Sequence, residues 1–174
     1  MFMIRKSLCG LVLILVTGYF SVLKAQQSFK GDILLEPLSG KQGETQLMVF
    51  VANQGIEPDA YVDFLNRIQK KTDFPLWIAT VKYFKGSLSA RGFDKKIERI
   101  RRYISSVEQS DIPKFKTWVT GHSKGAYLVR RVAEEYAGLI LFSSYYNRLT
   151  GPISGDINSF DKPLLVVSGE LDGI

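Results

Sequence analysis

Short apolar runs alternate with amphipathic stretches along most of the chain. The runs are rich in β-branched and aromatic side chains, as expected of strands covered on both faces, and occupy residues 46–52, 75–83, 115–120, 138–143 and 164–168. Between them, apolar residues recur at helical spacing in residues 58–71, 90–109 and 126–136. Strands that alternate with helices predict an α/β fold with three layers, in which helices cover both faces of a mostly parallel sheet.

The predicted helices each have an identifiable apolar side. In residues 90–109 it is made of side chains spaced by four, three, four and three residues, namely Phe93, Ile97, Ile100, Ile104 and Val107. The other two helices are expected to bury Tyr61, Phe64, Leu65 and Ile68, and Tyr127, Leu128, Val132 and Tyr136. Residues 26–45 are polar and rich in turns, and within them residues 33–35 could form a short edge strand.

The charged residues of the helix over 90–109 fall on its complementary faces. They are Lys95, Lys96, Glu98, Arg99, Arg101 and Arg102. No aromatic residues interleave with them on the exposed side, so we interpret the cluster as a solvated helix face rather than a surface for nucleic acid. We therefore expect no nucleic-acid partner.

The N-terminus has the layout of a secretory signal peptide. A short basic stretch precedes an uncharged apolar run from Leu8 to Leu23, and Lys24 and Ala25 follow. We therefore predict a signal peptide over residues 1–25, one domain over residues 26–174, and export to a periplasm or beyond. Leu23 is larger than the residue preferred near a cleavage site. The alternative is an uncleaved anchor, which would be the chain's only membrane contact.

Composition narrows the possible chemistry. The chain of 174 residues has 23 basic and 17 acidic residues, a formal charge of +6. Without residues 1–25, which hold three basic residues and no acid, the balance is 20 against 17. Cys9 is the only cysteine and lies in the apolar run, so the domain has neither a disulfide nor a cysteine nucleophile. His122 is the only histidine.

A glycine-flanked serine follows the third long apolar run. Residues 121–125 read Gly-His-Ser-Lys-Gly, which fits the Gly-x-Ser-x-Gly pattern of a nucleophile on a sharp turn between strand and helix. Side chains two residues before and after Ser123 would collide with the neighbouring strand and helix, which explains the two glycines. The alternative interpretation is an ordinary glycine-rich turn that binds an anion at the helix N-terminus.

Two further groups would complete a serine hydrolase. Asp172 follows the strand predicted over 164–168 and comes after Ser123 in the chain, as the acid of such a triad does. It would orient a histidine, or else cap a turn. The backbone amides of Lys124 and Gln54 are the candidate oxyanion donors, and the neighbours Asn53 and Gly55 could share the role of Gln54. An ordinary strand-to-helix connection is the alternative for the loop that holds Gln54.

His122 is an unsuitable base for its neighbour. Consecutive side chains diverge at the turn, so we expect His122 to fill a hydrophobic or hydrogen-bonded niche behind Ser123 instead of accepting its proton. A histidine that completes a triad would therefore have to come from outside these 174 residues.

These motifs resemble those of the α/β-hydrolase superfamily. Residues 121–125 are similar to its nucleophile elbow and residues 168–172 to its acid-bearing loop. Residues 53–61 are similar to the Gly-Gly-Gly-Val-Glu-Pro-Glu-Ala-Tyr segment of a dienelactone-hydrolase-like branch. The resemblance runs from about Gln46 to the last residue. It implies an esterase, lipase or thioesterase-like enzyme for a small acyl or ester substrate, without metal or cofactor.

The chain departs from that family in two ways. Asn53 and Gln54 replace the glycines of the oxyanion segment, and the family's catalytic histidine follows a further strand and helix after the acid. We therefore expect a fragment that lacks the last strand and helix, and a serine hydrolase that acts through Ser123 and an acyl-enzyme once it is complete. The alternative is a natural, non-catalytic α/β-hydrolase-like ligand-binding or scaffold protein. Neither the substrate nor the oligomeric state can be read from the sequence.

Overall fold

The computed structural model describes residues 27–29, 31–83, 89–144 and 160–169. Over these residues seven strands form one sheet in the order β1-β2-β4-β3-β5-β6-β7. The strands are β1 (Gln27–Phe29), β2 (Asp32–Leu35), β3 (Gln46–Val51), β4 (Leu76–Val81), β5 (Thr117–His122), β6 (Gly138–Phe142) and β7 (Leu164–Val167). The helices are α1 (Val62–Lys71), α2 (Ala90–Glu108) and α3 (Lys124–Val129), with short 3-10 turns η1 (Pro58–Tyr61), η2 (Lys114–Lys116) and η3 (Ala133–Glu135).

The sheet is mostly parallel, as predicted. β4, β3, β5, β6 and β7 pair in parallel, whereas β2 pairs antiparallel with both β1 and β4. Four of the five apolar runs contain one parallel strand each, and the run over 115–120 overlaps β5, which continues to His122. Residues 33–35 lie in a strand as expected, β2, but the expectation that this strand is at the edge of the sheet is wrong, because β1 pairs with its outer side. The sequence of β1 is polar and only three residues long, so no pattern marked it.

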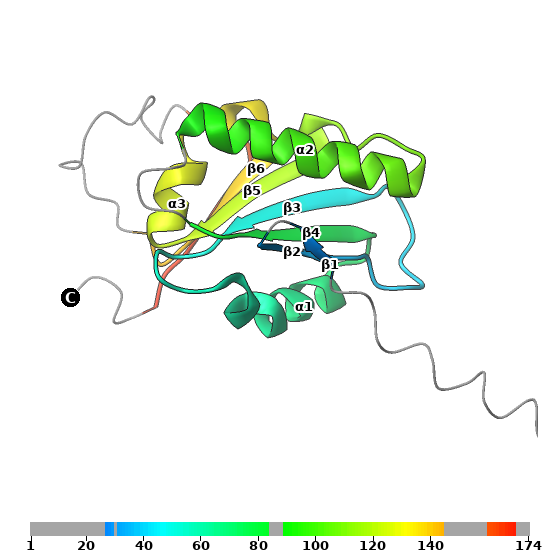
Figure 1. Ribbon diagram of the computed structural model, residues 1–174, viewed down its shortest axis with the longest axis horizontal. Coiled ribbons are helices and arrows are strands. Elements are labelled where there is room, and N and C mark those ends of the chain that lie inside the picture. Colours follow the sequence, from blue (N-terminus) through cyan, green and yellow to red (C-terminus); the bar gives the residue numbers. More distant parts are fainter. Residues whose placement is uncertain (1–26, 30, 84–88, 145–159, 170–174) are drawn as a thin grey trace, which may run out of the picture.

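The connections around β3 place the helices on opposite faces of the sheet. β3 leads through α1 to β4 on one side, and β4 leads through α2 to β5 on the other side of β3. Right-handed crossovers in opposite directions put their helices on opposite faces. Figure 1 shows α2 above the sheet and α1 below it. The carboxyl ends of β3 and β5 thus lie at a topological switch point, where open α/β sheets bind ligands.

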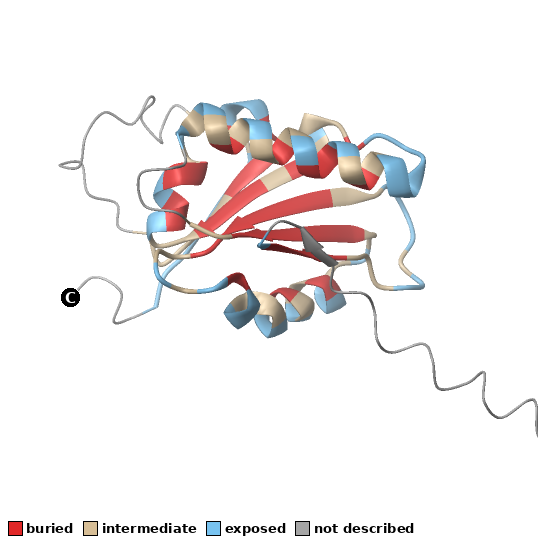
Figure 2. Cartoon of the chain, viewed as in Figure 1, coloured by how far each residue is buried: buried red, intermediate tan, exposed pale blue. Residues whose placement is uncertain are grey.

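The central strands are buried (Figure 2), and their alternate residues contribute to two separate cores. Leu47, Val49 and Val51 pack in the core under α2 and α3, whereas Met48 and Phe50 pack on the α1 side. All five are buried because helices cover both faces. This double burial explains why the strands read as unbroken apolar runs rather than as an alternating pattern.

Two predicted elements differ in detail from the structure. The helix expected over 126–136 stops at Val129 because the following amides bond three residues back instead of four, as in Val132 N to Val129 O, 3.2 Å. The strand expected over 115–120 starts at Thr117, after the turn η2. Three residues expected on buried helix faces are exposed, namely Phe64, Val107 and Tyr127.

Two of the basic residues of α2 are not solvated, contrary to the expectation. Arg101 is 9% exposed, and its Nε donates to the carbonyl of Ile112 at 2.5 Å. Lys96 Nζ lies 2.8 Å from Oδ1 of Asp32, an aspartate that is 2% exposed. These side chains fasten α2 to the loop before β5 and to β2. Lys95, Arg99 and Arg102 are exposed, whereas Glu98 is half-buried and pairs with Arg101 at 2.7 Å.

The buried Asp32 makes stability depend on pH. Burial raises the pKa of this carboxyl above its ordinary 3.8, and the hydrogen bond and charge of Lys96 oppose the rise only in part. The folded chain therefore keeps the proton at pH values where the unfolded chain has lost it, so Asp32 lowers the free energy of unfolding as pH rises through that window. We expect Asp32→Asn to remove this decline, as measured by urea unfolding between about pH 3 and pH 7.

The test compares the pH dependence of stability in the wild-type protein and in Asp32→Asn. Other carboxylates titrate in both proteins, so the relevant quantity is the wild-type free energy of unfolding minus that of Asp32→Asn. This difference should fall as pH rises from 3.8 upward. A difference that is constant, or that grows with pH, would show that Lys96 compensates the burial of Asp32 in full.

Two features border on parts of the chain that the structure does not describe. The predicted signal peptide over residues 1–25 lies outside the described residues. Within the described residues, no helix is long and apolar enough to span a membrane. β7 is the outermost strand of the described sheet, and its residues Leu164, Leu165, Val166 and Val167 are all exposed, by 39 to 53%.

Candidate active site

Ser123 occupies a strained turn between β5 and α3. Its backbone has φ 52° and ψ −112°, a conformation that residues with a side chain rarely adopt. Such strain costs on the order of 1–3 kcal/mol and persists only where surrounding contacts enforce it. The Ser123 amide donates to the carbonyl of Phe142 on β6 at 2.9 Å. The turn therefore lies at the carboxyl edge of the sheet, held by the neighbouring strand.

The two glycines that flank Ser123 have no room for a side chain. A Cβ at Gly121 would lie 2.5 Å from the carbonyl carbon of Gly125, and a Cβ at Gly125 would lie 2.3 Å from the carbonyl oxygen of Val51. Both obstacles are backbone atoms, which cannot move aside as a flexible side chain can. The steric reason expected for the Gly-x-Ser-x-Gly spacing is therefore present, because α3 starts directly against the end of β3.

We expect Gly125→Ala to push α3 away from β3. Overpacking of this kind costs about 1–3 kcal/mol of stability, and here it also displaces the Lys124 amide. Urea unfolding measures the stability, and the labelling of Ser123 by a fluorophosphonate measures the geometry. Gly40→Ala is the control for the geometry: its φ of 81° makes alanine strained and lowers stability, but nothing lies within 4 Å of the added Cβ, so labelling of Ser123 should stay unchanged. A Gly125→Ala protein with wild-type stability and labelling would contradict this account.

The loop after β3 brings a second amide to the turn. Asn53 accepts from the amide of Ile56 at 3.2 Å, and Gly55 has φ 83°, as in a type II turn with Gln54 at its second position. The Gln54 amide donates to Oδ1 of Asn53 at 2.8 Å, and the Lys124 amide donates to the same oxygen at 3.4 Å. The structure thus brings together the two amides predicted as oxyanion donors, and both are directed at one oxygen atom.

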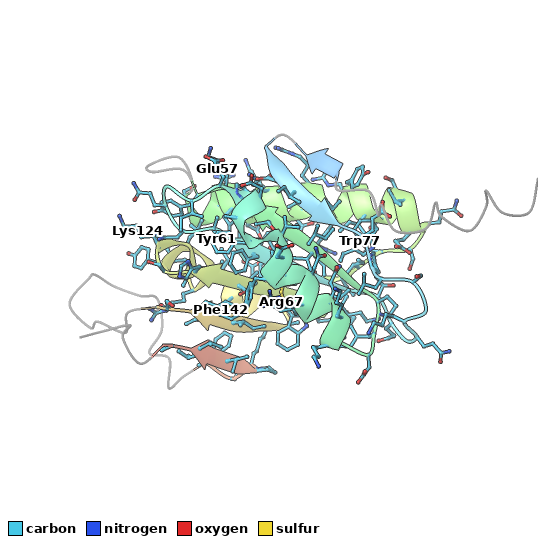
Figure 3. The ribbon with its side chains drawn as sticks, turned by 90° about the horizontal axis from the view of Figure 1, so that it is seen from below. Glu57, Tyr61, Arg67, Trp77, Lys124 and Phe142 are labelled. Carbon is cyan, nitrogen blue, oxygen red and sulfur yellow. The ribbon has the colours of Figure 1, made fainter. Side chains whose placement is uncertain are left out.

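The side chains of the same two residues also meet. Lys124 Nζ donates to Oε1 of Gln54 at 2.8 Å, in an exposed setting. Figure 3 shows Lys124 and Tyr61 at one end of the sheet and Trp77 toward the other end. The segments after β3 and β5, which are about 70 residues apart in sequence, therefore form one rim beside Ser123.

His122 lies in a hydrogen-bonded niche, as expected. Its Nδ1 is 2.8 Å from the hydroxyl of Tyr61, and the two rings meet edge to face with centroids 5.8 Å apart. The same hydroxyl accepts from the amide of Asn53 at 3.2 Å. Burial raises the pKa of Tyr61, and the bond from Asn53 opposes this only in part, so the hydroxyl keeps its proton at neutral pH. Tyr61 thereby joins the loop after β3 to the serine turn.

Three of the four predicted site residues lie within the described residues. Ser123 and Lys124 are adjacent in the turn, and Gln54 lies across from them. Asp172 is outside the described residues. The strand before Asp172, β7, pairs with β6 in parallel. Its carboxyl end therefore lies at the same edge of the sheet as Ser123.

Sequence reasoning missed two contributors to this site. Asn53 was considered only as a neighbour of Gln54, and its side chain was given no role. Tyr61 was assigned to the apolar side of a helix, yet its hydroxyl makes two hydrogen bonds. Its functional position could have been inferred because Tyr61 ends the segment 53–61, which is similar to a family segment that also ends in tyrosine. In the described part of the chain, no group of three or more potential metal ligands is clustered.

Several solved structures are similar to this chain. The Francisella virulence factor BioJ is 16% identical with a TM-score of 0.50, over 68% of this chain and 42% of BioJ. An esterase from Rhizomucor miehei is 11% identical with a TM-score of 0.51, over 72% and 42%. Thermogutta terrifontis esterase 2, solved after phosphorylation by paraoxon, is 9% identical with a TM-score of 0.51, over 82% and 68%. The chain has the α/β-hydrolase fold.

The comparisons reach no further than this fold. No family model and no curated protein matches the chain. The chain spans less than half the length of BioJ and of the Rhizomucor esterase. These structural neighbours are serine hydrolases and esterases, so the resemblance seen in the sequence is confirmed at the level of the fold.

Proposed function

We propose that this protein is a serine hydrolase that cleaves an ester or a related acyl bond in a small molecule. One arrangement carries the proposal: Ser123 sits on a strained turn between two glycines that admit no side chain, beside two amides directed at one point. A glycine-rich turn that only binds an anion would not require the strained φ of Ser123. The hydrolase fold of the structural neighbours supports the same class of reaction.

The proposed reaction proceeds through a covalent intermediate. Ser123 Oγ attacks the substrate carbonyl carbon, and its proton passes to a histidine base. The oxyanion accepts hydrogen bonds from the amides of Gln54 and Lys124. The alcohol or thiol then leaves with the proton from the histidine. Water next attacks the acyl-enzyme by the same route, which releases the acid and restores the Ser123 hydroxyl.

We assign the base and its acid outside the described residues. Nδ1 of His122 is engaged with Tyr61, so we propose that the base is a histidine beyond these 174 residues, oriented by Asp172. We also propose that residues 1–25 direct export, with membrane attachment only where that segment is not cleaved. Each assignment concerns the protein made from the full open reading frame.

A fluorophosphonate probe tests the proposed nucleophile. The protein expressed from its full open reading frame is incubated with the probe, digested and analysed by peptide mass spectrometry. We expect one phosphonyl group, on the peptide that carries Ser123, because the probe reacts with activated serines. Heat-denatured protein serves as the control and should not react. A folded protein without an adduct would favour a non-catalytic ligand-binding protein, and an adduct on another residue would refute the assignment of Ser123.

A further inference from the structure

Both proposed oxyanion donors already donate hydrogen bonds to an oxygen atom of the protein itself. Oδ1 of Asn53 lies 2.8 Å from the Gln54 amide and 3.4 Å from the Lys124 amide. We propose that the Asn53 carboxamide is an internal ligand of the oxyanion hole, which competes with the substrate carbonyl and so determines access to Ser123. This inference rests on the proposed function, because it takes these two amides to be the oxyanion donors.

The chemistry of the contact favours competition. Oδ1 is the oxygen of a neutral planar carbonyl group, as is the reacting oxygen of an ester, so the two would make bonds of similar strength to the same amides. An oxyanion carries charge and accepts stronger hydrogen bonds than either carbonyl. Asn53 should therefore compete with the bound ester more effectively than with the transition state.

Opening the hole requires movement of one side chain only. The Asn53 amide donates to Tyr61, and the Asn53 carbonyl accepts from Ile56, so the backbone of this residue is held on both sides. Asn53 is half-buried rather than enclosed in the core. We therefore infer a rotation of the carboxamide away from the two amides, with the loop and the turn around Ser123 unchanged.

The contact between the side chains of Lys124 and Gln54 does not block the oxyanion hole. Lys124 Nζ donates to Gln54 Oε1 at 2.8 Å in an exposed position, where such contacts contribute little. The family segment to which residues 53–61 are similar has glycines at positions 53 and 54, and glycine has no side chain that could enter the hole. Asn53 is thus the one residue of the described loop whose side chain meets both amides.

Two substitutions at Asn53 should act in opposite directions. Asn53→Ala removes the internal ligand, and we expect fluorophosphonate labelling of Ser123 to become about tenfold faster. Asn53→Asp replaces the carbonyl with a carboxylate that binds both amides more strongly, and labelling should become at least about tenfold slower. With an activated ester, the gain for Asn53→Ala should lie in a lower KM at an unchanged kcat. Asn66→Ala, on α1, is the matched control.

The opposite interpretation makes the opposite prediction. If Asn53 serves to order the two amides, its removal slows labelling and lowers kcat. Slower labelling of Asn53→Ala, or equal rates for the alanine and aspartate variants, would therefore overturn the proposal.

A second readout is independent of the reactivity of Ser123. Hydrogen exchange of the Gln54 and Lys124 amides, followed by NMR on the same proteins, reports whether Oδ1 of Asn53 accepts from them. We expect exchange about tenfold faster in Asn53→Ala, and unchanged in Asn66→Ala. Equal rates in wild type and Asn53→Ala would overturn the proposal. If no variant is labelled, the nucleophile proposed above fails, while amide exchange still decides the role of Asn53.

Discussion

Replacing Ser123 by alanine is expected to reduce the hydrolysis of an activated short-chain ester by at least about a thousandfold. Removal of the nucleophile from a serine hydrolase eliminates the covalent route and leaves only what the oxyanion donors and substrate binding contribute. Alanine has the same Cβ as serine, so the strain at a φ of 52° is essentially unchanged, and we expect the fold to persist. The measurement is kcat/KM for p-nitrophenyl acetate in protein from the full open reading frame.

The control for Ser123→Ala is a serine far from the turn. Ser106 lies on the exposed side of α2, where its hydroxyl donates to the carbonyl of Tyr103. Ser106→Ala should retain the wild-type kcat/KM. If Ser123→Ala also retained it, the hydrolysis would arise from another group, and the proposed mechanism would be wrong.

Gln54→Pro should reduce the same rate by about a hundredfold to a thousandfold. Proline removes the backbone N–H, and the loss of one oxyanion donor typically has this effect. Gln54 occupies the second position of a turn in which Gly55 has φ 83°. Proline is favoured at that position. The substitution therefore removes the donor without opposing the local backbone, and urea unfolding should show little loss of stability.

Gln54→Ala separates the amide from the side chain. Both variants lose the bond from Lys124 Nζ to Gln54 Oε1, but only proline loses the N–H. We expect alanine to cost much less activity than proline. Equal losses would assign the effect to the side chain and would remove Gln54 from the proposed oxyanion hole.

The fold was predictable where its causes are local in sequence. Each central strand is buried on both faces, so a run such as Leu47 to Val51 is apolar throughout and bounded by polar turns. The glycines at 121 and 125 could be interpreted because their steric demand follows from the turn itself. The spacing of Phe93, Ile97, Ile100 and Ile104 likewise predicted one buried face of α2, and all four are buried.

Other features depended on contacts between distant segments. The side chain of Arg101 could be placed on a solvated face by helical spacing, but its burial depends on the carbonyl of Ile112 in the next loop. Asn53 Oδ1 meets the Lys124 amide across 71 positions of sequence, through one choice of side-chain rotamer. Exposure of Phe64 depends on where α1 lies over the sheet. No periodicity within one segment encodes such pairings.

Trapping the acyl-enzyme tests the central claim most directly. The protein from its full open reading frame is mixed with p-nitrophenyl acetate, quenched in acid within seconds, digested and analysed by mass spectrometry. The account predicts one acetyl group on Ser123, which forms with a burst of p-nitrophenol and is absent from Ser123→Ala. Release of p-nitrophenol without acetylated Ser123, or acetylation that persists in Ser123→Ala, would contradict it.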